Sequence, residues 1–260
     1  MIAETAIIPA TICESADMTT ANRKSQALVR IRFPDIPERT PDDMTSAKAI
    51  HLNGRSHSLR VHLSNQPNTI VDAEHYISPI PTRDMTGIVY PDLLIAFNAN
   101  PEALGESNAY VISEQGKPPD FVLEVASRST RTYDRTTKRD IYAGLEIPEY
   151  WRFDERPTRN NPGLAGDRLL DGEYQPIAID ILPDGRLRGH STVLNLILEW
   201  HEGQLNWIDP ETETPIANFE EERKARVAER DARILAEHRA NTAEARNLEL
   251  EEELRRLRGE

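Results

Sequence analysis

The stretch PPDFVLEVASRST, residues 118–130, places a carboxylate where a buried strand needs hydrocarbon. The residues from Phe121 to Ala126 form a short apolar run, as in a β-strand covered on both faces, and Glu124 interrupts it. Side chains alternate along a strand, so Glu124 shares a face with Val122 and Ala126. An ionised carboxylate buried there alone costs many kcal/mol, so it must be protonated, paired or bound to a metal.

A second apolar run, GIVYPDLLIAF, predicts a strand over residues 88–97, with Asp92 at its entrance. The preceding Pro91 agrees with this, because proline is tolerated at the start of a strand. If this strand neighbours the one that holds Glu124, the two carboxylates meet and repel each other. A divalent cation between them would remove that repulsion, and carboxylate oxygens are ligands that suit Mg²⁺.

Residues 129–151, which follow the Glu124 strand, predict a helix of about 15 residues. Ser129 or Thr130 is suited to cap its first turn. Gly144 and Pro148 bracket its end, since glycine favours helix C-termini and proline cannot continue a helix.

The inward face of this helix carries Lys138 together with the large apolar side chains, Tyr142 among them. A lysine aimed at the neighbouring strand can neutralise Glu124 or orient a water molecule. The ordinary alternative is that Lys138 and Asp134 form an i,i+4 surface pair worth a few tenths of a kcal/mol. The combination with Asp92 favours a functional role, because three placements against the hydrophobic pattern are harder to explain by chance.

The remainder of the chain predicts mainly strands. EYWRFD, residues 149–154, reads as a strand, and the alternation of Leu59, Val61 and Leu63 predicts a half-buried one. Turn signals mark β-hairpins at three places: Asp171-Gly172, Asp184-Gly185 and Glu202-Gly203. This mixture of strands with one well-marked helix indicates an α+β or mixed α/β fold.

Composition limits the functional classes. The chain has 260 residues and a formal net charge of −13, which counts against tight, non-specific binding of nucleic acid but leaves a metal-dependent site open. Cys13 is the one cysteine, so no internal disulfide can form. No apolar stretch reaches the length of a membrane span, and the acidic N-terminus is a poor signal peptide, so we expect a cytoplasmic protein.

Three regions follow from these patterns: a loosely ordered N-terminal segment (1–45), a globular domain (46–217) and a charged helix (218–260). In the last region Leu250, Leu254 and Leu257 fit d-a-d heptad spacing. A second set fits the same spacing in a register offset by one: Ala228, Ala232 and Leu235. We expect a helix that joins chains into a homo-oligomer through residues 219–260, or else a solvated single helix.

Four ordered motifs give the chain a resemblance to a known family. They are YPDLLIAF, PPDFVLEVASRSTRTYD, KRDIYAGLEIPEYWRFD and RLLDGEYQPI. Together they resemble the Uma2 family of endonucleases, which has the PD-(D/E)XK restriction-endonuclease-like fold of a core sheet flanked by helices. The resemblance covers residues 70–210, and the charged C-terminal helix is also similar to that of longer members.

The resemblance implies Mg²⁺-dependent hydrolysis of phosphodiester bonds in DNA, with Mn²⁺ as a substitute for Mg²⁺. Asp92 and Glu124 would be the metal ligands and, with Lys138, the catalytic residues. In the wider fold a lysine stands two residues after the glutamate, where this chain has Ala126, and Lys138 resembles a relocated substitute. Glu74 is a weak candidate for a third acid.

Two functions of different classes therefore remain open. The first is a metal-dependent DNA endonuclease, favoured by Asp92, Glu124 and Lys138. The second is a catalytically inactive descendant that acts as an assembly or regulatory module through its C-terminal helix, favoured by Ala126 and the acidic net charge. A local basic cluster can bind DNA phosphates, although a solvated helix start is the commoner explanation: Arg128, Arg131, Arg135, Lys138 and Arg139.

Overall fold

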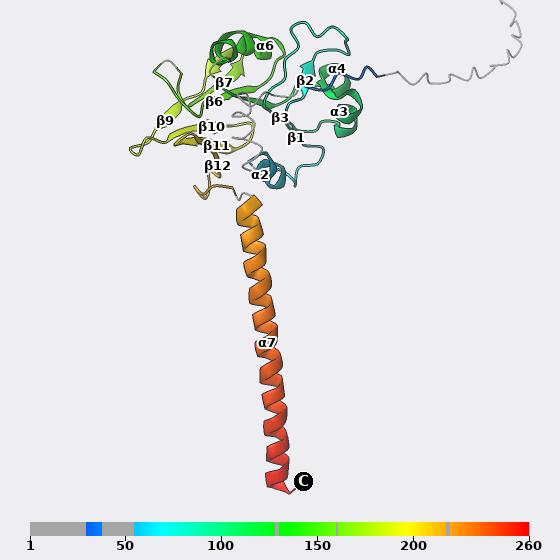
Figure 1. The fold of residues 1–260 in the computed structure, drawn as a ribbon, viewed down its shortest axis with the longest axis vertical. Coiled ribbons are helices and arrows are strands. Elements are labelled where there is room, and N and C mark those ends of the chain that lie inside the picture. Colours follow the sequence, from blue (N-terminus) through cyan, green and yellow to red (C-terminus); the bar gives the residue numbers. More distant parts are fainter. Residues whose placement is uncertain (1–29, 38–54, 128–129, 160, 217–218, 260) are drawn as a thin grey trace, which may run out of the picture.

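The computed structural model describes residues 30–37, 55–127, 130–159, 161–216 and 219–259. These residues form a globular unit of strands and short helices, from which one long C-terminal helix projects (Figure 1). The α+β class is confirmed, because an extended sheet carries helices on one of its faces.

The central sheet has six strands in the order β1-β3-β5-β6-β7-β8. Their bounds are β1 (Ile70–Asp72), β3 (Leu93–Ala96), β5 (Phe121–Val125), β6 (Glu149–Phe153), β7 (Leu164–Leu170) and β8 (Glu173–Pro176). Neighbours are antiparallel except β5 and β6, which are parallel because a helical crossover joins them. The crossover comprises α5 (Arg131–Tyr133), the π-helical turn η2 (Asp134–Lys138) and α6 (Arg139–Gly144).

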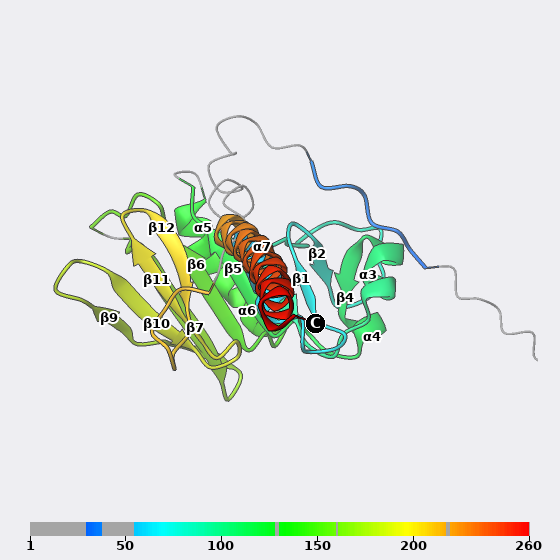
Figure 2. The same ribbon diagram turned by 90° about the horizontal axis from the view of Figure 1, so that it is seen from below.

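A second sheet of four antiparallel strands packs against one face of the central sheet (Figure 2). Its strands are β9 (Ile179–Ile181), β10 (Leu187–Ser191), β11 (Leu196–His201) and β12 (Gln204–Ile208). The core between the sheets takes Leu123 from β5, Trp151 from β6 and Leu198 from β11. On the opposite face, Tyr142 of α6 packs with Val122 of β5 in a separate cluster.

The smaller elements lie beside the β1 edge of the central sheet (Figure 1). They are α2 (Arg55–His62), β2 (Tyr76–Ser78), α3 (Pro101–Ser107), β4 (Ala109–Val111) and α4 (Ile112–Gln115). The extended residues 30–37 pack on this region, where the Phe33 side chain is buried and its amide donates to the Ser107 carbonyl at 2.8 Å. The rest of the predicted loose N-terminal segment, including Cys13, lies outside the described residues.

Several predictions about local structure are confirmed. The strand over residues 149–154 is β6, and the three turn signals connect β7 to β8, β9 to β10 and β11 to β12. Two of these turns place both central residues at positive φ, which suits the twist of a two-residue hairpin. They are Asp171 (53°) with Gly172 (81°) and Glu202 (49°) with Gly203 (76°).

The prediction of a strand at Leu59, Val61 and Leu63 is wrong, because α2 covers most of this stretch. Leu59 and Leu63 are buried and Val61 is exposed, a pattern that also arises from the i,i+4 spacing of a helix. The run of three alternating residues was too short to separate the two periods.

Two boundaries also differ from prediction. The strand expected over 88–97 is regular only as β3, after Asp92. Thr130 is at the N-cap position, but its side chain does not cap the helix, because its Oγ1 accepts from the amide of Ser127 at 3.1 Å. Ser129 lies outside the described residues.

The predicted C-terminal helix is present as α7 (Phe219–Arg258), 40 residues long and therefore about 60 Å in length. Within the described part of the chain, no helix has the length and apolar character needed to cross a membrane.

Trp151 packs between the two sheets, where its indole ring lies close to the backbone of both. Its indole, which is fully buried, lies against Gly166 of β7 and Gly189 of β10. A Cβ atom built on Gly166 would be 2.8 Å from Trp151 Cε3, and one on Gly189 would be 2.7 Å from Cη2. Both positions therefore need glycine for lack of space.

We predict that Gly189→Ala lowers the free energy of unfolding by about 1–3 kcal/mol, because the added methyl group overpacks this contact. The matched control is Gly105→Ala in α3, where nothing lies within 4 Å of the added atom. The control should stabilise the helix by about 0.5–1 kcal/mol. Urea denaturation measures both, and equal stability of Gly189→Ala and the parent chain would contradict the packing described.

Candidate active site

The β3–β5 register places Asp92 and Glu124 side by side. The pairs Leu93–Leu123 and Leu94–Val122 are opposite each other, and extending the register by one residue sets Asp92 opposite Glu124. Directly opposed residues of antiparallel strands point to the same face. The amide of Val125 donates to Asp92 Oδ2 at 2.7 Å, which fixes the aspartate against β5.

Both carboxylate oxygens of Glu124 have partners from the crossover helix. Lys138 Nζ lies 2.7 Å from Oε2, and the Tyr142 hydroxyl donates to Oε1 at 2.6 Å. Glu124 is 2% exposed and Tyr142 is fully buried, so this pairing takes place away from solvent. The carboxylate inside the strand is therefore compensated by a lysine, as the sequence indicated.

The crossover helix widens into a π-helical turn where it passes the strands. Asp134 begins this turn and Lys138 ends it, with 3.3 Å between Oδ1 and Nζ. The Tyr150 hydroxyl donates to the Asp134 carbonyl at 2.8 Å, and a side chain inserted into the hydrogen-bond ladder distorts a helix locally. Single π turns are frequent at functional sites, and this one presents both charged groups to Glu124.

Asp92, Glu124, Asp134 and Lys138 form a buried cluster, here called the Glu124 cluster. Burial has the largest effect on the pKa values of Glu124, Asp134 and Lys138. Burial raises the pKa of Glu124 to about 8; Lys138 opposes this increase, whereas the nearby Asp92 and Asp134 carboxylates add to it. Burial likewise raises the pKa of Asp134, against the effect of Lys138. Burial alone would lower the pKa of Lys138, but Glu124 and Asp134 outweigh it and raise that pKa, so the ammonium group stays charged.

The donor set suits a hard divalent cation. Asp92, Glu124 and Asp134 offer carboxylate oxygens, the ligands that Mg²⁺ prefers. Asp134 is 1% exposed, and its side-chain partners are Lys138, whose Nζ lies 3.3 Å from Oδ1, and Thr130. The described residues do not, however, include three His, Cys, Asp or Glu side chains already arranged around one point. Lys138 supplies the positive charge in this arrangement.

The structure thus brings together all three predicted site residues, Asp92, Glu124 and Lys138. Their catalytic and metal-binding roles remain predictions. Sequence reasoning left out Asp134 and Tyr142 as site members. The signal for both was the spacing D-x-x-x-K-x-x-x-Y, which places three side chains on one helix face, toward Glu124.

Two further predicted positions lie beside the cluster. Glu74 follows β1, where its amide donates to the Pro91 carbonyl at 3.1 Å and its φ is 55°. It remains a weak candidate for a third acid. Ala126 lines a hollow of about 170 Å³ together with Asp134, at the place where the wider fold has a lysine.

Most residues of the predicted basic cluster form ion pairs with acidic side chains of the same chain. Arg131 binds Asp154 through two hydrogen bonds of 2.6 and 3.0 Å, and Arg139 Nη2 lies 3.1 Å from Asp167 Oδ1. Lys138 belongs to the carboxylate cluster. These contacts support the structural explanation of the cluster over DNA binding. Arg128 lies outside the described residues.

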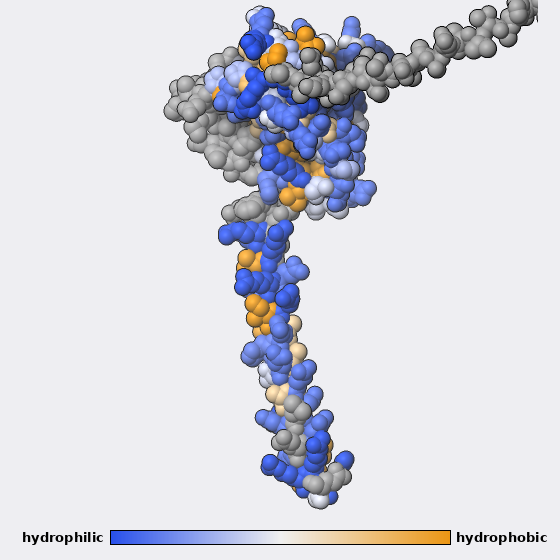
Figure 3. All heavy atoms as spheres, turned by 90° about the vertical axis from the view of Figure 1, so that its right-hand side faces the viewer, coloured by the Kyte–Doolittle hydropathy of each residue, from blue (hydrophilic) through white to orange (hydrophobic). Residues whose placement is uncertain are grey.

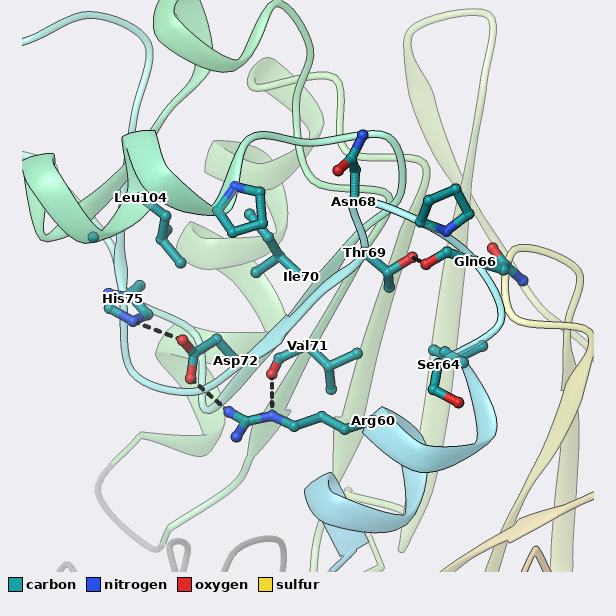
Figure 4. A pocket seen from close by; sticks show the side chains of 14 residues that line it. Arg60, Ser64, Gln66, Asn68, Thr69, Ile70, Val71, Asp72, His75 and Leu104 are labelled. Atoms are coloured by element: carbon teal, nitrogen blue, oxygen red, sulfur yellow. Dashed lines mark hydrogen bonds and ion pairs between the residues drawn. The ribbon is translucent and has the colours of Figure 1, made fainter.

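A larger hollow of about 660 Å³ lies between α2, β1 and α3 (Figure 4). Its ionic groups are already paired with one another. Arg60 Nη2 is 3.0 Å from Asp72 Oδ1, and His75 Nε2 is 3.1 Å from Asp72 Oδ2. This hollow therefore offers no buried, under-coordinated carboxylate, and the Glu124 cluster is the stronger candidate active site.

Comparisons with known proteins identify the family of the chain. A family model for Uma2, described as "Putative restriction endonuclease", matches residues 53–200. The chain belongs to the Uma2 family. The predicted Uma2 resemblance is therefore confirmed, and the matched residues contain Asp92, Glu124, Asp134 and Lys138.

Among solved structures, the chain is similar to one titled as a putative nuclease belonging to DUF820 from Anabaena variabilis ATCC 29413. The two are 12% identical with a TM-score of 0.37, over 56% of this chain and 75% of that one. No curated protein matches the chain.

Removing the lysine tests the electrostatics of the cluster. In Lys138→Met, Glu124 keeps its two acidic neighbours but loses its cation, so its pKa rises above the present value of about 8. A buried acid whose pKa is raised on folding loses stability as pH rises. Near pH 5 Glu124 is protonated in both folded chains and contributes no difference between them. Between pH 8 and pH 9 the parent ionises Glu124 and the variant does not, so the variant should lose up to about 1.4 kcal/mol more unfolding free energy than the parent over that pH unit.

Lys224→Met on exposed α7 is the control for Lys138→Met, and its unfolding free energy should change little at either pH. Guanidinium denaturation at both pH values measures the effect. A loss that is the same at pH 5 and pH 9 would contradict the assignment of Lys138 as the counter-ion of Glu124.

Proposed function

We propose that the protein is a Mg²⁺-dependent DNA endonuclease that acts in the cytoplasm, with Mn²⁺ able to replace Mg²⁺. The observation that carries the proposal is the buried convergence of Asp92 and Glu124 from adjacent strands with Asp134 and Lys138 from one helical turn. Family membership supports a nuclease activity.

Asp92 and Glu124 would hold the cation, with Asp134 beside them. When bound, Mg²⁺ would polarise the phosphodiester and acidify a water molecule. Binding of the cation by Glu124 would require Oε2 to give up its ion pair with Lys138, whose ammonium group would still contact Asp134 in the same site. Lys138 would offset the negative charge that develops on the phosphate in the transition state.

Tyr142 would act as a positioning residue. Its hydroxyl, fixed in the core, donates to Glu124 Oε1 and holds the carboxylate plane while Oε2 changes partner. Asp92 is held in a similar way by the amide of Val125. Both acids are therefore oriented by groups that do not take part in the reaction.

The second candidate is the inactive assembly module. It is supported by Ala126 at the usual lysine position and by the ion pair that already satisfies Glu124. The two proposals differ in what happens when a divalent cation and DNA are added.

Plasmid nicking separates the candidates. With Mg²⁺ or Mn²⁺ the purified protein should convert supercoiled plasmid to the nicked form, and Asp92→Asn or Glu124→Gln should lower the rate at least about 100-fold. The matched control is Glu199→Gln, a buried acid of β11 that pairs with Arg188 in the other sheet. Cutting by Asp92→Asn at the rate of the parent chain would reveal a contaminating nuclease and remove the enzyme proposal.

Metal affinity should depend on pH, because a metal binds the ionised carboxylate. Glu124 has a pKa of about 8, so Mn²⁺ affinity should rise by up to roughly tenfold per pH unit below that value and level off above it. Calorimetric titration with Mn²⁺ from pH 6 to pH 9 measures this, with Glu199→Gln as a control that should match the parent. A pH-independent affinity would show that Glu124 is not a ligand.

A further inference from the structure

The C-terminal half of α7 continues the heptad of its three leucines toward the globular unit. Positions a and d hold small or apolar residues with one amide among them: Ala240, Ala243, Asn247, Leu250, Leu254 and Leu257. Leu250, Leu254 and Leu257 are 42%, 50% and 78% exposed, and the helix projects away from both sheets (Figure 1). Figure 3 shows a mostly hydrophilic helix surface, on which the strongly apolar spheres lie mainly in the half nearest the globular unit.

The a and d positions of residues 239–258 form an apolar seam along the helix, and the charged residues beside this seam indicate which partner helix it can bind. In a parallel, in-register pair of helices, each g residue faces the e residue five positions later on the other chain. All three such pairs in this region join opposite charges: Arg239 with Glu244, Arg246 with Glu251, and Glu253 with Arg258. A second copy of the same chain is therefore complementary to this surface.

Asn247 points to the same arrangement. It occupies an a position, with apolar leucines or alanines at the neighbouring core positions. A single buried asparagine at an a position specifies register and favours a two-stranded parallel coiled coil, because its amide pairs with the same residue of the partner helix. The ion pair of Arg246 with Glu249 within the helix is exposed on both sides and weak, so it does not prevent the interchain contact.

We propose that residues 239–258 of α7 form a parallel, in-register, two-stranded coiled coil with a second copy of this chain. Because the helices run in the same direction, the dimer carries both globular units at one end. The seam is set by Asn247 and the three leucines, and partner choice is set by the three charge pairs. The proposal does not depend on nuclease activity.

A charge-swap experiment on the full chain tests partner choice. Glu244→Arg/Glu251→Arg makes two of the pairs repulsive, and so does Arg239→Glu/Arg246→Glu. By sedimentation, the parent chain should be a dimer and each double variant a monomer. An equimolar mixture of the variants should regain the dimer, because every altered residue then faces its opposite charge.

Three results would overturn the proposal: a monomeric parent chain, a double variant that stays dimeric, or a mixture that stays monomeric. These substitutions lie on an exposed helix, so a folded globular unit is expected in each case and is checked by the denaturation midpoint.

Disulfide trapping tests the direction of the helices. In a Cys13→Ser background, Leu250→Cys and Leu257→Cys place thiols at successive d positions, which face themselves in a parallel dimer. Both single variants should form interchain disulfides under mild oxidation. In an antiparallel pair at most one of the two positions can meet its own copy, so trapping at only one position would contradict the parallel arrangement.

Discussion

The candidate site depends on one constraint: the Glu124 carboxyl group is buried inside a strand, and Lys138 and Tyr142 contact its two oxygens. A carboxylate in the middle of a fully buried strand is unstable unless something compensates its charge. The compensation comes from a helix that is tied to the same strand by sequence, since the β5–α6–β6 crossover must pack back over β5. The strand and the helix therefore specify each other through one charged contact as well as through the apolar cluster around Tyr142.

The charges around Glu124 also explain why this carboxylate is suited to exchange Lys138 for a metal cation. Asp92 and Asp134 stand close enough to raise the pKa of Glu124, so the cluster holds more negative charge than one lysine balances when all three acids are ionised. Buried acids whose pKa is strongly raised occur frequently at functional sites. The π-helical turn η2 places Asp134 and Lys138 near Glu124, and the helix departs from regular α-helical geometry there.

Much of this arrangement was predictable from sequence. The alternation in β5 placed Glu124 on the helix side, and the spacing of Lys138 and Tyr142 placed them opposite it. The register that sets Asp92 beside Glu124 was not predictable, because strand pairing depends on non-local contacts. The π turn and the participation of Asp134 were missed since an i,i+4 Asp–Lys pair looks the same in sequence whether it is exposed or buried.

The wrong strand prediction at Leu59, Val61 and Leu63 also arose because one sequence pattern fits two structures. Three residues satisfy a strand period and a helix period almost equally well, and only the burial of Leu59 and Leu63 with Val61 exposed separates them. The basic cluster shows the opposite case. Its members are close together in the sequence, but Arg131 and Arg139 pair with Asp154 and Asp167, which come more than twenty residues later.

The most direct test of the account is the position of a bound metal. Crystals grown or soaked with Mn²⁺ should show an anomalous peak between the Asp92 and Glu124 carboxylates, with metal–oxygen distances of about 2.1 Å, and Lys138 Nζ should have moved from Glu124 Oε2. A Mn²⁺-saturated crystal with no peak there, and with the Glu124–Lys138 ion pair intact, would contradict it.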